Sequence, residues 1–203
     1  MFTIILQLLG WLIFIAASII LGAWLRKHPS KRGAERTSLI LHSLFWAGVA
    51  PAIGLGFFYP GLTRFDAELG LTPLPQSSTL QLLGMTVSFI GVCLLLESNM
   101  ALWILGSGAN AFLLTKRLVA GGIYQWTRNP MSLGIYLIAI GIGLLVGSTY
   151  LTAGALLLFI PAHIFYLKYF EEYELELRLG EVYLEYKQKV PFLIPGFNFQ
   201  HKS

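Results

Sequence analysis

The sequence predicts an all-α membrane protein: a transmembrane bundle of about five spans, followed by a helix on the cytoplasmic side. The 203 residues are 56% hydrophobic and only 12% charged, with a mean hydropathy of +0.69, which is too apolar for an ordinary soluble domain of this size. The apolar residues also gather into runs of about 20, the length at which a helix crosses a bilayer. We therefore expect a single integral membrane domain over residues 1–203.

Five apolar windows are long enough to span. They are residues 4–25, 38–59, 80–105, 131–147 and 149–170. The first window lacks a basic leader and a small-residue cleavage site, so we expect a retained helix rather than a signal peptide.

The basic residues predict an orientation. Segment 26–37 carries five basic residues and one acidic residue, and short loops with that excess stay on the cytoplasmic side. Alternation then places the N-terminus and loop 60–79 outside, segment 106–130 inside, the turn near 147–150 outside and the C-terminus inside. An odd number of spans satisfies every loop. We expect the protein to lie in a bacterial cytoplasmic membrane. We expect no nucleic-acid partner, because the basic residues are scattered at the membrane edges.

Two kinds of helix irregularity stand out. Pro51 in the second window and Pro161 in the fifth each remove a backbone donor and predict a bend. In the fourth window Ala139, Gly143 and Gly147 recur at every fourth position, which favours close packing of another helix. We expect this packing within the bundle, with a homodimer as the alternative, and the oligomeric state stays open.

Beyond the last window the chain changes to a helical period with a polar face. Four apolar residues follow one side of this helix: Leu175, Leu179, Val182 and Tyr186. Glu171 and Glu172 fall on opposite borders of that stripe and are expected to face protein. Three other glutamates are expected to point away: Glu174, Glu181 and Glu185. Lys168 lies one turn before Glu172 and is a candidate to neutralise it, and Gly180 is a candidate helix break.

The stretch 116–131 is the one polar, glycine-punctuated passage between the two apolar halves. Gly121 and Gly122 allow positive φ angles, and Asn129 before Pro130 is forced to be extended just ahead of the fourth span. Arg128 offers a guanidinium fork suited to a carboxylate or phosphate, although an arginine at this depth is more often an interfacial anchor. Carboxylates near bilayer depth are costly and tend to be functional, so Glu171 and Glu172 are the matching candidates.

Other reactive residues give weaker signals. Glu97, inside the third window, either meets the interface or faces a polar cavity. Cys93 is expected to be a small buried hydrophobe, and as the only cysteine it rules out an intrachain disulfide or CxxC site. His42 and His163 are expected to be hydrogen-bonded packing residues. No metal-ligand spacing, P-loop, dinucleotide fingerprint or nucleophile elbow is present.

A set of short motifs runs through residues 106–195. It comprises Leu118-Val119, Gly122-Ile123-Tyr124, Arg128-Asn129-Pro130-Met131, Glu171-Glu172, Leu179-Gly180, Tyr183, Tyr186 and Val190-Pro191 with Pro195. Together they resemble the isoprenylcysteine carboxyl methyltransferase and phospholipid methyltransferase superfamily. That family consists of small multi-span helical enzymes that take a methyl group from S-adenosylmethionine at a cytoplasmic-side pocket and pass it to a lipid-like acceptor.

The resemblance implies a cofactor pocket with Arg128, Glu171 and Glu172 as its catalytic members. Its cofactor-binding residues would be Leu118, Val119, Gly122, Ile123, Tyr124, Arg128, Asn129, Pro130, Glu171, Glu172 and Tyr183. Arg128 would pair with the cofactor carboxylate, either glutamate would accept from its ribose hydroxyls or ammonium, and tyrosine rings would lie near the sulfonium or adenine. Two positions depart from the pattern: Asn129 stands where many relatives have His, and Ser132 where Tyr is frequent.

Two other functions fit part of the sequence. A sterol-type membrane reductase would bind NADPH, but the dinucleotide phosphate should need more basic residues than Lys116, Arg117 and Arg128 supply. A non-enzymatic scaffold would use the small-residue face of the fourth span. The methyl acceptor stays open among a prenylated cysteine carboxylate, a phospholipid amine, a thiol and another hydrophobic molecule.

Overall fold

The computed structural model describes residues 1–106 and 117–195, and every regular element in these ranges is helical. The α-helices are Phe2–Lys27 (α1), Lys31–Leu44 (α2), Ala50–Phe58 (α3), Phe65–Leu69 (α4), Ser78–Leu105 (α5), Pro130–Val146 (α6), Thr149–Gly154 (α7), Ile160–Tyr166 (α8), Glu172–Leu179 (α9) and Glu181–Lys189 (α10). The predicted all-helical class is confirmed. Lys116, which was named from the sequence, lies outside the described residues.

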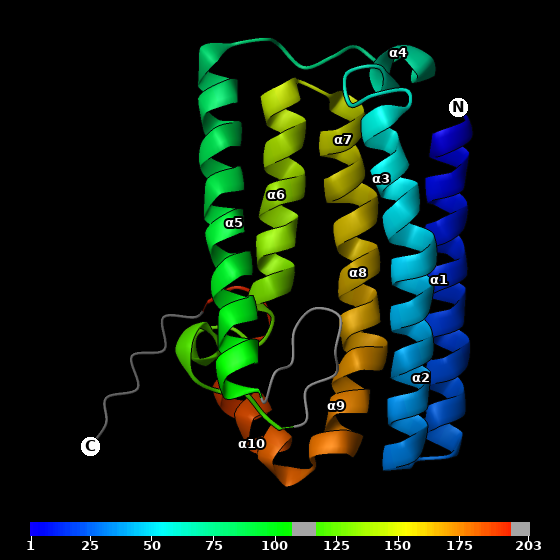
Figure 1. The fold of residues 1–203 in the computed structure, drawn as a ribbon, viewed down its shortest axis with the longest axis vertical. Coiled ribbons are helices and arrows are strands. Elements are labelled where there is room, and N and C mark those ends of the chain that lie inside the picture. The colour runs from blue at the N-terminus through cyan, green and yellow to red at the C-terminus, as the bar shows by residue number, and fades with distance from the viewer. Residues whose placement is uncertain (107–116, 196–203) are drawn as a thin grey trace.

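The helices join into five long rods (Figure 1). Four are long and apolar enough to cross a membrane: Phe2–Lys27, Lys31–Phe58, Ser78–Leu105 and Thr149–Leu179. Pro130–Val146 is a shorter apolar helix. These rods agree with the expected five spans and make the chain an integral membrane protein. Two of the helices extend beyond the apolar windows. The second rod already begins at Lys31, because Ser30 caps it by accepting from the Gly33 N–H at 3.1 Å, and the last rod continues past residue 170 to Leu179.

Widened π-helical turns interrupt two of the rods. The turns Phe45–Val49 and Ala155–Phe159 each precede a proline, Pro51 and Pro161 respectively, at the start of the next α-helical stretch. A third π turn, Leu167–Glu171, immediately precedes Glu172. A π turn holds an extra residue, so it rotates every later side chain relative to an unbroken α-helix.

Two expectations for the C-terminal helices are wrong. Glu174 does not point away from the protein: it is 1% exposed, because α9 also packs against α2, where Ser38 lies against the Glu174 carboxylate. Val182 is 60% exposed and does not continue the apolar stripe, because the chain turns at Gly180 with a φ of 67° and starts a new helix. The buried face of α10 is formed by Tyr183 and Tyr186.

Close glycine contacts hold α5 against α6. A Cβ atom on Gly84 would lie 2.7 Å from the Gly141 carbonyl oxygen, and one on Gly91 would lie 2.6 Å from that of Gly134. The two backbones therefore touch, as small residues permit in membrane helices. The small-residue face predicted on α6 is used within the chain at Gly143, where a Cβ atom would lie 2.5 Å from the Thr152 hydroxyl of α7.

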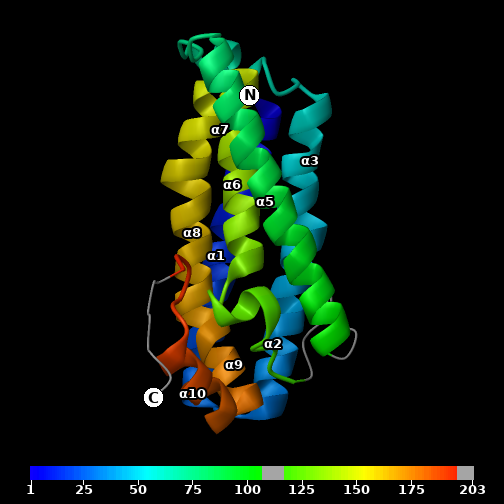
Figure 2. The same cartoon turned by 90° about the vertical axis from the view of Figure 1, so that its left-hand side faces the viewer.

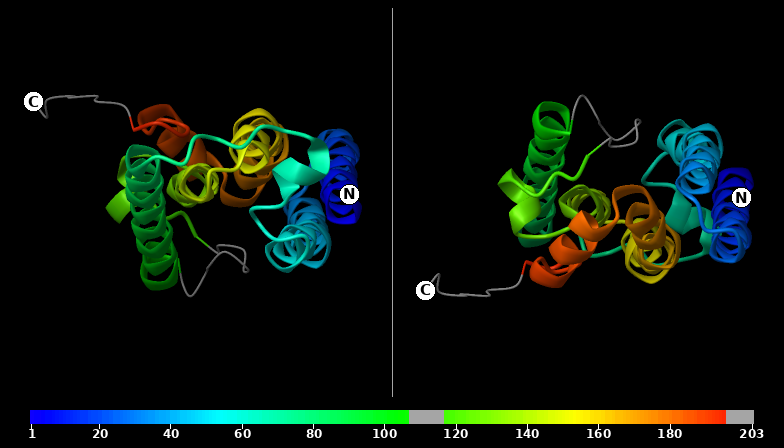
Figure 3. Two further views of the ribbon diagram at one scale, coloured as in Figure 1. Left: turned by 90° about the horizontal axis from the view of Figure 1, so that it is seen from above. Right: turned by 90° about the horizontal axis from the view of Figure 1, so that it is seen from below.

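The rod of α7, α8 and α9 lies between the α5–α6 pair and the α1–α3 group (Figures 1 and 3). Its inner side joins an aromatic core against the first two rods, built from Trp11, Phe14, Leu25, Ala34, Leu41, Val49, Tyr166, Leu167 and Phe170. The core fixes the position of residues 166–170, and therefore of the acidic residues that follow them.

The connections divide between the two ends of the bundle (Figures 1 and 2). One end holds the N-terminus, α4 and the α6–α7 turn, where the Asp66 carboxylate accepts from the N–H groups of Thr149 and Tyr150 at 3.0 and 2.6 Å. This bond pattern caps α7. The other end holds the α1–α2 turn, residues 117–129 and α10. This division is the one that five antiparallel crossings require.

Candidate functional site

Residues 117–129 form an ordered corner below α6. Gly122 has a φ of 59°, which favours glycine, and it starts a short 3₁₀ helix, Gly122–Gln125. The turn buries Tyr124 against Leu102 of α5. The Tyr186 hydroxyl donates to the Tyr124 carbonyl at 2.5 Å and so joins α10 to the corner.

A second set of bonds ties the start of α6 to the C-terminal segment 191–193. The backbone N–H of Arg128 donates to the residue 191 carbonyl at 2.9 Å. The Asn129 side-chain amide donates to the residue 192 carbonyl at 2.9 Å, and the Thr127 hydroxyl donates to the residue 193 carbonyl at 2.8 Å. Asn129 therefore has a structural partner, and Pro130 follows it at the first helical turn, where the missing N–H is not needed.

The Arg128 guanidinium forms an ion pair with Glu172 across this corner. Both side chains are mostly buried, at 9% and 13% exposure. The second carboxylate oxygen of Glu172 lies 3.0 Å from the Lys187 ammonium, which also lies 2.8 Å from Glu176. Glu172 is therefore held between two cations. The lysine expected to neutralise it, Lys168, lies instead over the ring of Phe192.

The pKa values of the groups on α10 follow from this packing. Burial lowers the pKa of Lys187, but its hydrogen bonds to Glu176 and Glu172 outweigh that effect and raise it above the ordinary value. Burial raises the pKa of Tyr183 and of Tyr124 above the ordinary tyrosine value. At neutral pH α10 therefore carries a charged lysine, and the phenols of Tyr183 on α10 and Tyr124 in the corner are neutral.

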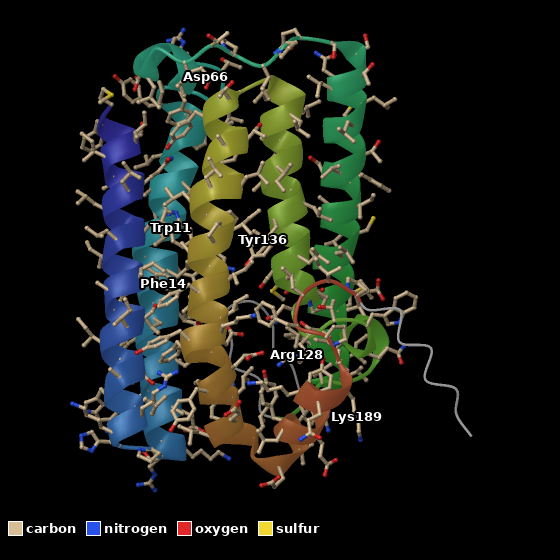
Figure 4. The ribbon with its side chains drawn as sticks, turned by 180° about the vertical axis from the view of Figure 1, so that it is seen from behind. Trp11, Phe14, Asp66, Arg128, Tyr136 and Lys189 are labelled. Atoms are coloured by element: carbon tan, nitrogen blue, oxygen red, sulfur yellow. The ribbon has the colours of Figure 1, made fainter. Side chains whose placement is uncertain are left out.

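A cavity of about 250 Å³ opens beside the Arg128–Glu172 pair. Helices α1, α2, α5, α6, α8 and α9, together with the corner, contribute its walls. The polar and ionisable lining residues are Ser38, His42, Tyr124, Arg128, Asn129, Ser132, His163, Tyr166, Glu171, Glu174 and Arg178. Figure 4 shows Arg128 near the lower end of α6, on the side of α9 and α10.

The phospholipid methyltransferase family model matches residues 80–181, half of the chain. The chain belongs to this family. The matched part of the methyltransferase begins in α5, includes Arg128, Glu171 and Glu172, and ends before Tyr183. No curated protein and no solved structure matches the chain.

The structure brings five of the predicted cofactor residues of this methyltransferase to the cavity wall: Tyr124, Arg128, Asn129, Pro130 and Glu171. The remaining six do not line the cavity: Leu118, Val119, Gly122, Ile123, Glu172 and Tyr183. Several of these act behind the wall. Val119 belongs to one buried cluster with Tyr124, and Leu118 packs against the cluster that contains Tyr183. Glu172 forms the ion pair with the Arg128 guanidinium.

Sequence reasoning missed a second ion pair at the cavity of this phospholipid methyltransferase family member. Glu174 pairs with Arg178 one turn later on α9, and both side chains are almost fully buried. The i, i+4 spacing of an acid and a base was visible, but it is equally typical of a solvated helix face. Glu171, Glu174 and Arg178 recur at three and four residues and therefore share one side of the helix.

The first rods of the methyltransferase contribute residues that the sequence did not single out as site members. Ser38 and His42 of α2 line the cavity, and Ser38 lies against the Glu174 carboxylate. The expectation that both apolar-run histidines are hydrogen-bonded is confirmed. The His42 Nδ1 lies 3.0 Å from the Ser38 carbonyl oxygen, and the His163 Nδ1 lies 2.8 Å from the Tyr136 hydroxyl.

Two other candidates in the phospholipid methyltransferase fold lie away from the cavity. Glu97 is exposed on the outer face of α5 and does not line it. Cys93 is also exposed on α5, so the expectation that it is buried was wrong. The reason is that a membrane helix can present a small apolar residue outward as readily as inward. Within residues 1–106 and 117–195, no group of three His, Cys, Asp or Glu side chains is placed to hold a metal ion.

Proposed function

We propose that this membrane methyltransferase uses S-adenosylmethionine and transfers the methyl group to a hydrophobic acceptor that resides in the membrane. One observation carries the proposal: Arg128 and Glu171, on elements more than 40 residues apart, line one cavity with a second acid–base pair, Glu174 and Arg178. Membership of the phospholipid methyltransferase family supports the reaction type.

The lining residues fit the polar groups of this cofactor. S-adenosylmethionine carries a carboxylate, an ammonium group, ribose hydroxyls and a cationic sulfur, so its site needs both acids and bases. Among the described residues the buried Arg128 Nε has no hydrogen-bond partner, and buried donors are rarely left unsatisfied. Arg128 would therefore bind the cofactor carboxylate, and Glu171 would accept from its ammonium or ribose hydroxyls.

Glu172 has a different role in this proposal. Its two carboxylate oxygens already contact Arg128 and Lys187, so it orients the guanidinium rather than contacting the cofactor. The rings of Tyr124 and Tyr166 line the same cavity and offer π faces to a cation.

Methyl transfer from this cofactor needs no covalent catalyst on the protein. The cofactor supplies an electrophilic methyl group on a sulfonium, so the chain mainly has to hold the nucleophile in line and exclude water. Tyr124 of the corner lines the cavity, and the bonds from Thr127 and Asn129 to the C-terminal segment hold that corner in place. The acceptor would enter from the membrane side.

The site would lie on the cytoplasmic side. The turn between α1 and α2 is at the same end of the bundle as the cavity, and the sequence around it carries Arg26, Lys27, Lys31, Arg32 and Arg36. Such an excess in a short connection favours the cytoplasmic face. The N-terminus would then be outside, in a bacterial cytoplasmic membrane, and the acceptor would be a lipid or a lipid-modified molecule of that bilayer.

The charge of the cavity disfavours the NADPH reductase. Its described wall contains two arginines, Arg128 and Arg178, and two glutamates, Glu171 and Glu174, so their formal charges cancel. A dinucleotide with several phosphates would need a surplus of positive charge. S-adenosylmethionine carries one anionic and two cationic groups, so it needs no such surplus.

Calorimetric titration of the purified protein with S-adenosylmethionine and, separately, with NADPH tests the proposal. Arg128→Ala and Glu171→Gln should each weaken S-adenosylmethionine binding by tenfold or more, which corresponds to about 1.4 kcal/mol. Arg64→Ala, an exposed arginine at the opposite end of the bundle, is the matched control and should bind normally. Binding of NADPH in place of S-adenosylmethionine, or unchanged binding in both site variants, would refute the assignment.

Transfer of a labelled methyl group into a lipid extract of the host identifies the acceptor. The labelled product separates a phospholipid amine from a prenylated carboxylate or a thiol.

A further inference from the structure

A second cavity, of about 300 Å³, lies in the part of the bundle farther from the Arg128 corner. Helices α1, α3, α6 and α7 and the Ala155–Phe159 turn line it, together with Phe65 of α4. Its wall is almost entirely hydrocarbon, including Trp11, Ile138, Ala139 and Ile142. We call it the apolar cavity, and the proposed function leaves it unused.

The polar atoms at the apolar cavity are already satisfied by one another. The Tyr150 hydroxyl donates to the Gln7 side-chain oxygen at 2.8 Å, and the Gln7 amide donates to the Ala52 carbonyl at 3.2 Å. Within residues 1–106 and 117–195, no charged residue lines the apolar cavity. A ligand here would therefore gain nothing from polar groups, and its buried part should be hydrocarbon.

The apolar cavity adjoins the cavity at Arg128, because the two share wall residues. Phe45 and Ile135 line both of them. Along α6, Met131 and Ser132 belong to the first cavity, and Ile138, Ala139 and Ile142 belong to the second. At a rise of 1.5 Å per residue, Met131 to Ile142 spans about 16 Å, roughly half the hydrocarbon thickness of a bilayer.

We propose that the apolar cavity binds the hydrocarbon tail of the methyl acceptor, with the acceptor's reactive head at the Arg128 cavity. This inference rests on the proposed function and adds a binding site for the tail. The acceptor's chain runs along the inner face of α6, past Phe45 and Ile135, toward Tyr150. The tail then anchors the acceptor by apolar burial, while the polar cavity orients its head.

Gly154 offers a direct way to fill the apolar cavity. It lines the cavity, and a Cβ atom there would meet no heavy atom within 4 Å, so a larger side chain enters open space. Gly54 of α3 is the matched control, because its Cβ atom also meets nothing within 4 Å and it lines neither cavity. We expect Gly154→Leu to reduce labelled methyl transfer into host lipid extract at least tenfold with unchanged S-adenosylmethionine binding. Gly54→Leu should retain both.

Trp11 reports occupancy without any need for activity. It lines the apolar cavity and is 5% exposed, whereas the other tryptophans, Trp24, Trp46, Trp103 and Trp126, are exposed. With those four replaced by Phe, the fluorescence of Trp11 is measured in vesicles of host lipid extract after bromine addition across its double bonds. Brominated chains quench tryptophan only at short range. We expect quenching, relieved by Gly154→Leu and not by Gly54→Leu.

The two readouts separate the possible failures. If the protein with Trp11 as its only tryptophan transfers methyl but shows no quenching of Trp11, the tail site is overturned and the proposed function stays intact. If Gly154→Leu relieves the quenching but leaves methyl transfer unchanged, the cavity binds an unrelated bilayer lipid. That outcome also overturns the tail site. A wild-type protein that neither binds S-adenosylmethionine nor transfers methyl overturns the proposed function, and the acceptor assignment with it. Relief of quenching together with loss of transfer supports the inference.

Discussion

Arg128 and Glu172 form a buried ion pair between the start of α6 and the start of α9. The pair joins the two halves of the site, which are 44 residues apart in the sequence. Because Lys187 holds the other oxygen of Glu172, the carboxylate cannot rotate without losing one of its cations. We therefore propose that Glu172 positions Arg128.

Glu172→Gln should weaken S-adenosylmethionine binding by about tenfold, or about 1.4 kcal/mol, because the amide cannot hold two cations and Arg128 loses its fixed orientation. Calorimetric titration measures this loss. Glu185→Gln, an exposed glutamate on α10, is the control and should bind like the wild type. Equal binding by Glu172→Gln and wild type would show that Arg128 is positioned by other contacts.

The Glu174–Arg178 pair makes a stability prediction. Removing one partner of a buried ion pair leaves an uncompensated charge and typically costs about 3–5 kcal/mol. We expect Arg178→Leu alone to lower the melting temperature in detergent strongly, and the double variant Glu174→Met with Arg178→Leu to recover much of the loss. A double variant as unstable as the single one would indicate that packing, not charge, dominates at this position.

The number and class of the spans could be predicted from the sequence, because hydropathy over about 20 residues depends on local composition alone. The alternation of connections between two ends follows from that number. The depth of Glu174 could not be predicted by helical projection from Leu175 and Leu179, because α2 covers a second side of α9, and that packing is tertiary information.

The site was only partly predictable for a similar reason. The family motifs brought Arg128 and Glu172 together in the prediction, and the structure pairs them. No sequence motif marks Lys187 or His42 as a site residue. In the sequence Lys187 resembles a solvated helix residue, and His42 resembles a packing residue. Their positions depend on how α10 turns back at Gly180 and on how α2 packs, which is tertiary information.

The contact between α5 and α6 predicts a steric effect. A Cβ atom on Gly91 would lie 2.6 Å from a backbone oxygen, so Gly91→Ala must push the two helices apart. Overpacking of this kind costs about 1–3 kcal/mol. Thermal unfolding in detergent measures it, with Gly48→Ala as the control because a Cβ atom there meets nothing within 4 Å. A Gly91→Ala variant as stable as the control would mean that α5 and α6 pack less tightly than these distances indicate.

The bonds between Thr127 and the C-terminal segment predict a change in protease sensitivity. The Thr127 hydroxyl is buried and donates to the Leu193 carbonyl at 2.8 Å, so Thr127→Val loses a net stabilisation of about 0.5–1.5 kcal/mol and leaves that carbonyl unsatisfied. The segment after α10 should then open more often, and trypsin should cleave after Lys189 several times faster. Mass spectrometry of timed digests measures the rate, and Thr63→Val, an exposed threonine at the opposite end, should leave it unchanged. Equal rates in both variants would show that the Asn129 and Arg128 bonds to residues 191–192 hold the segment without Thr127.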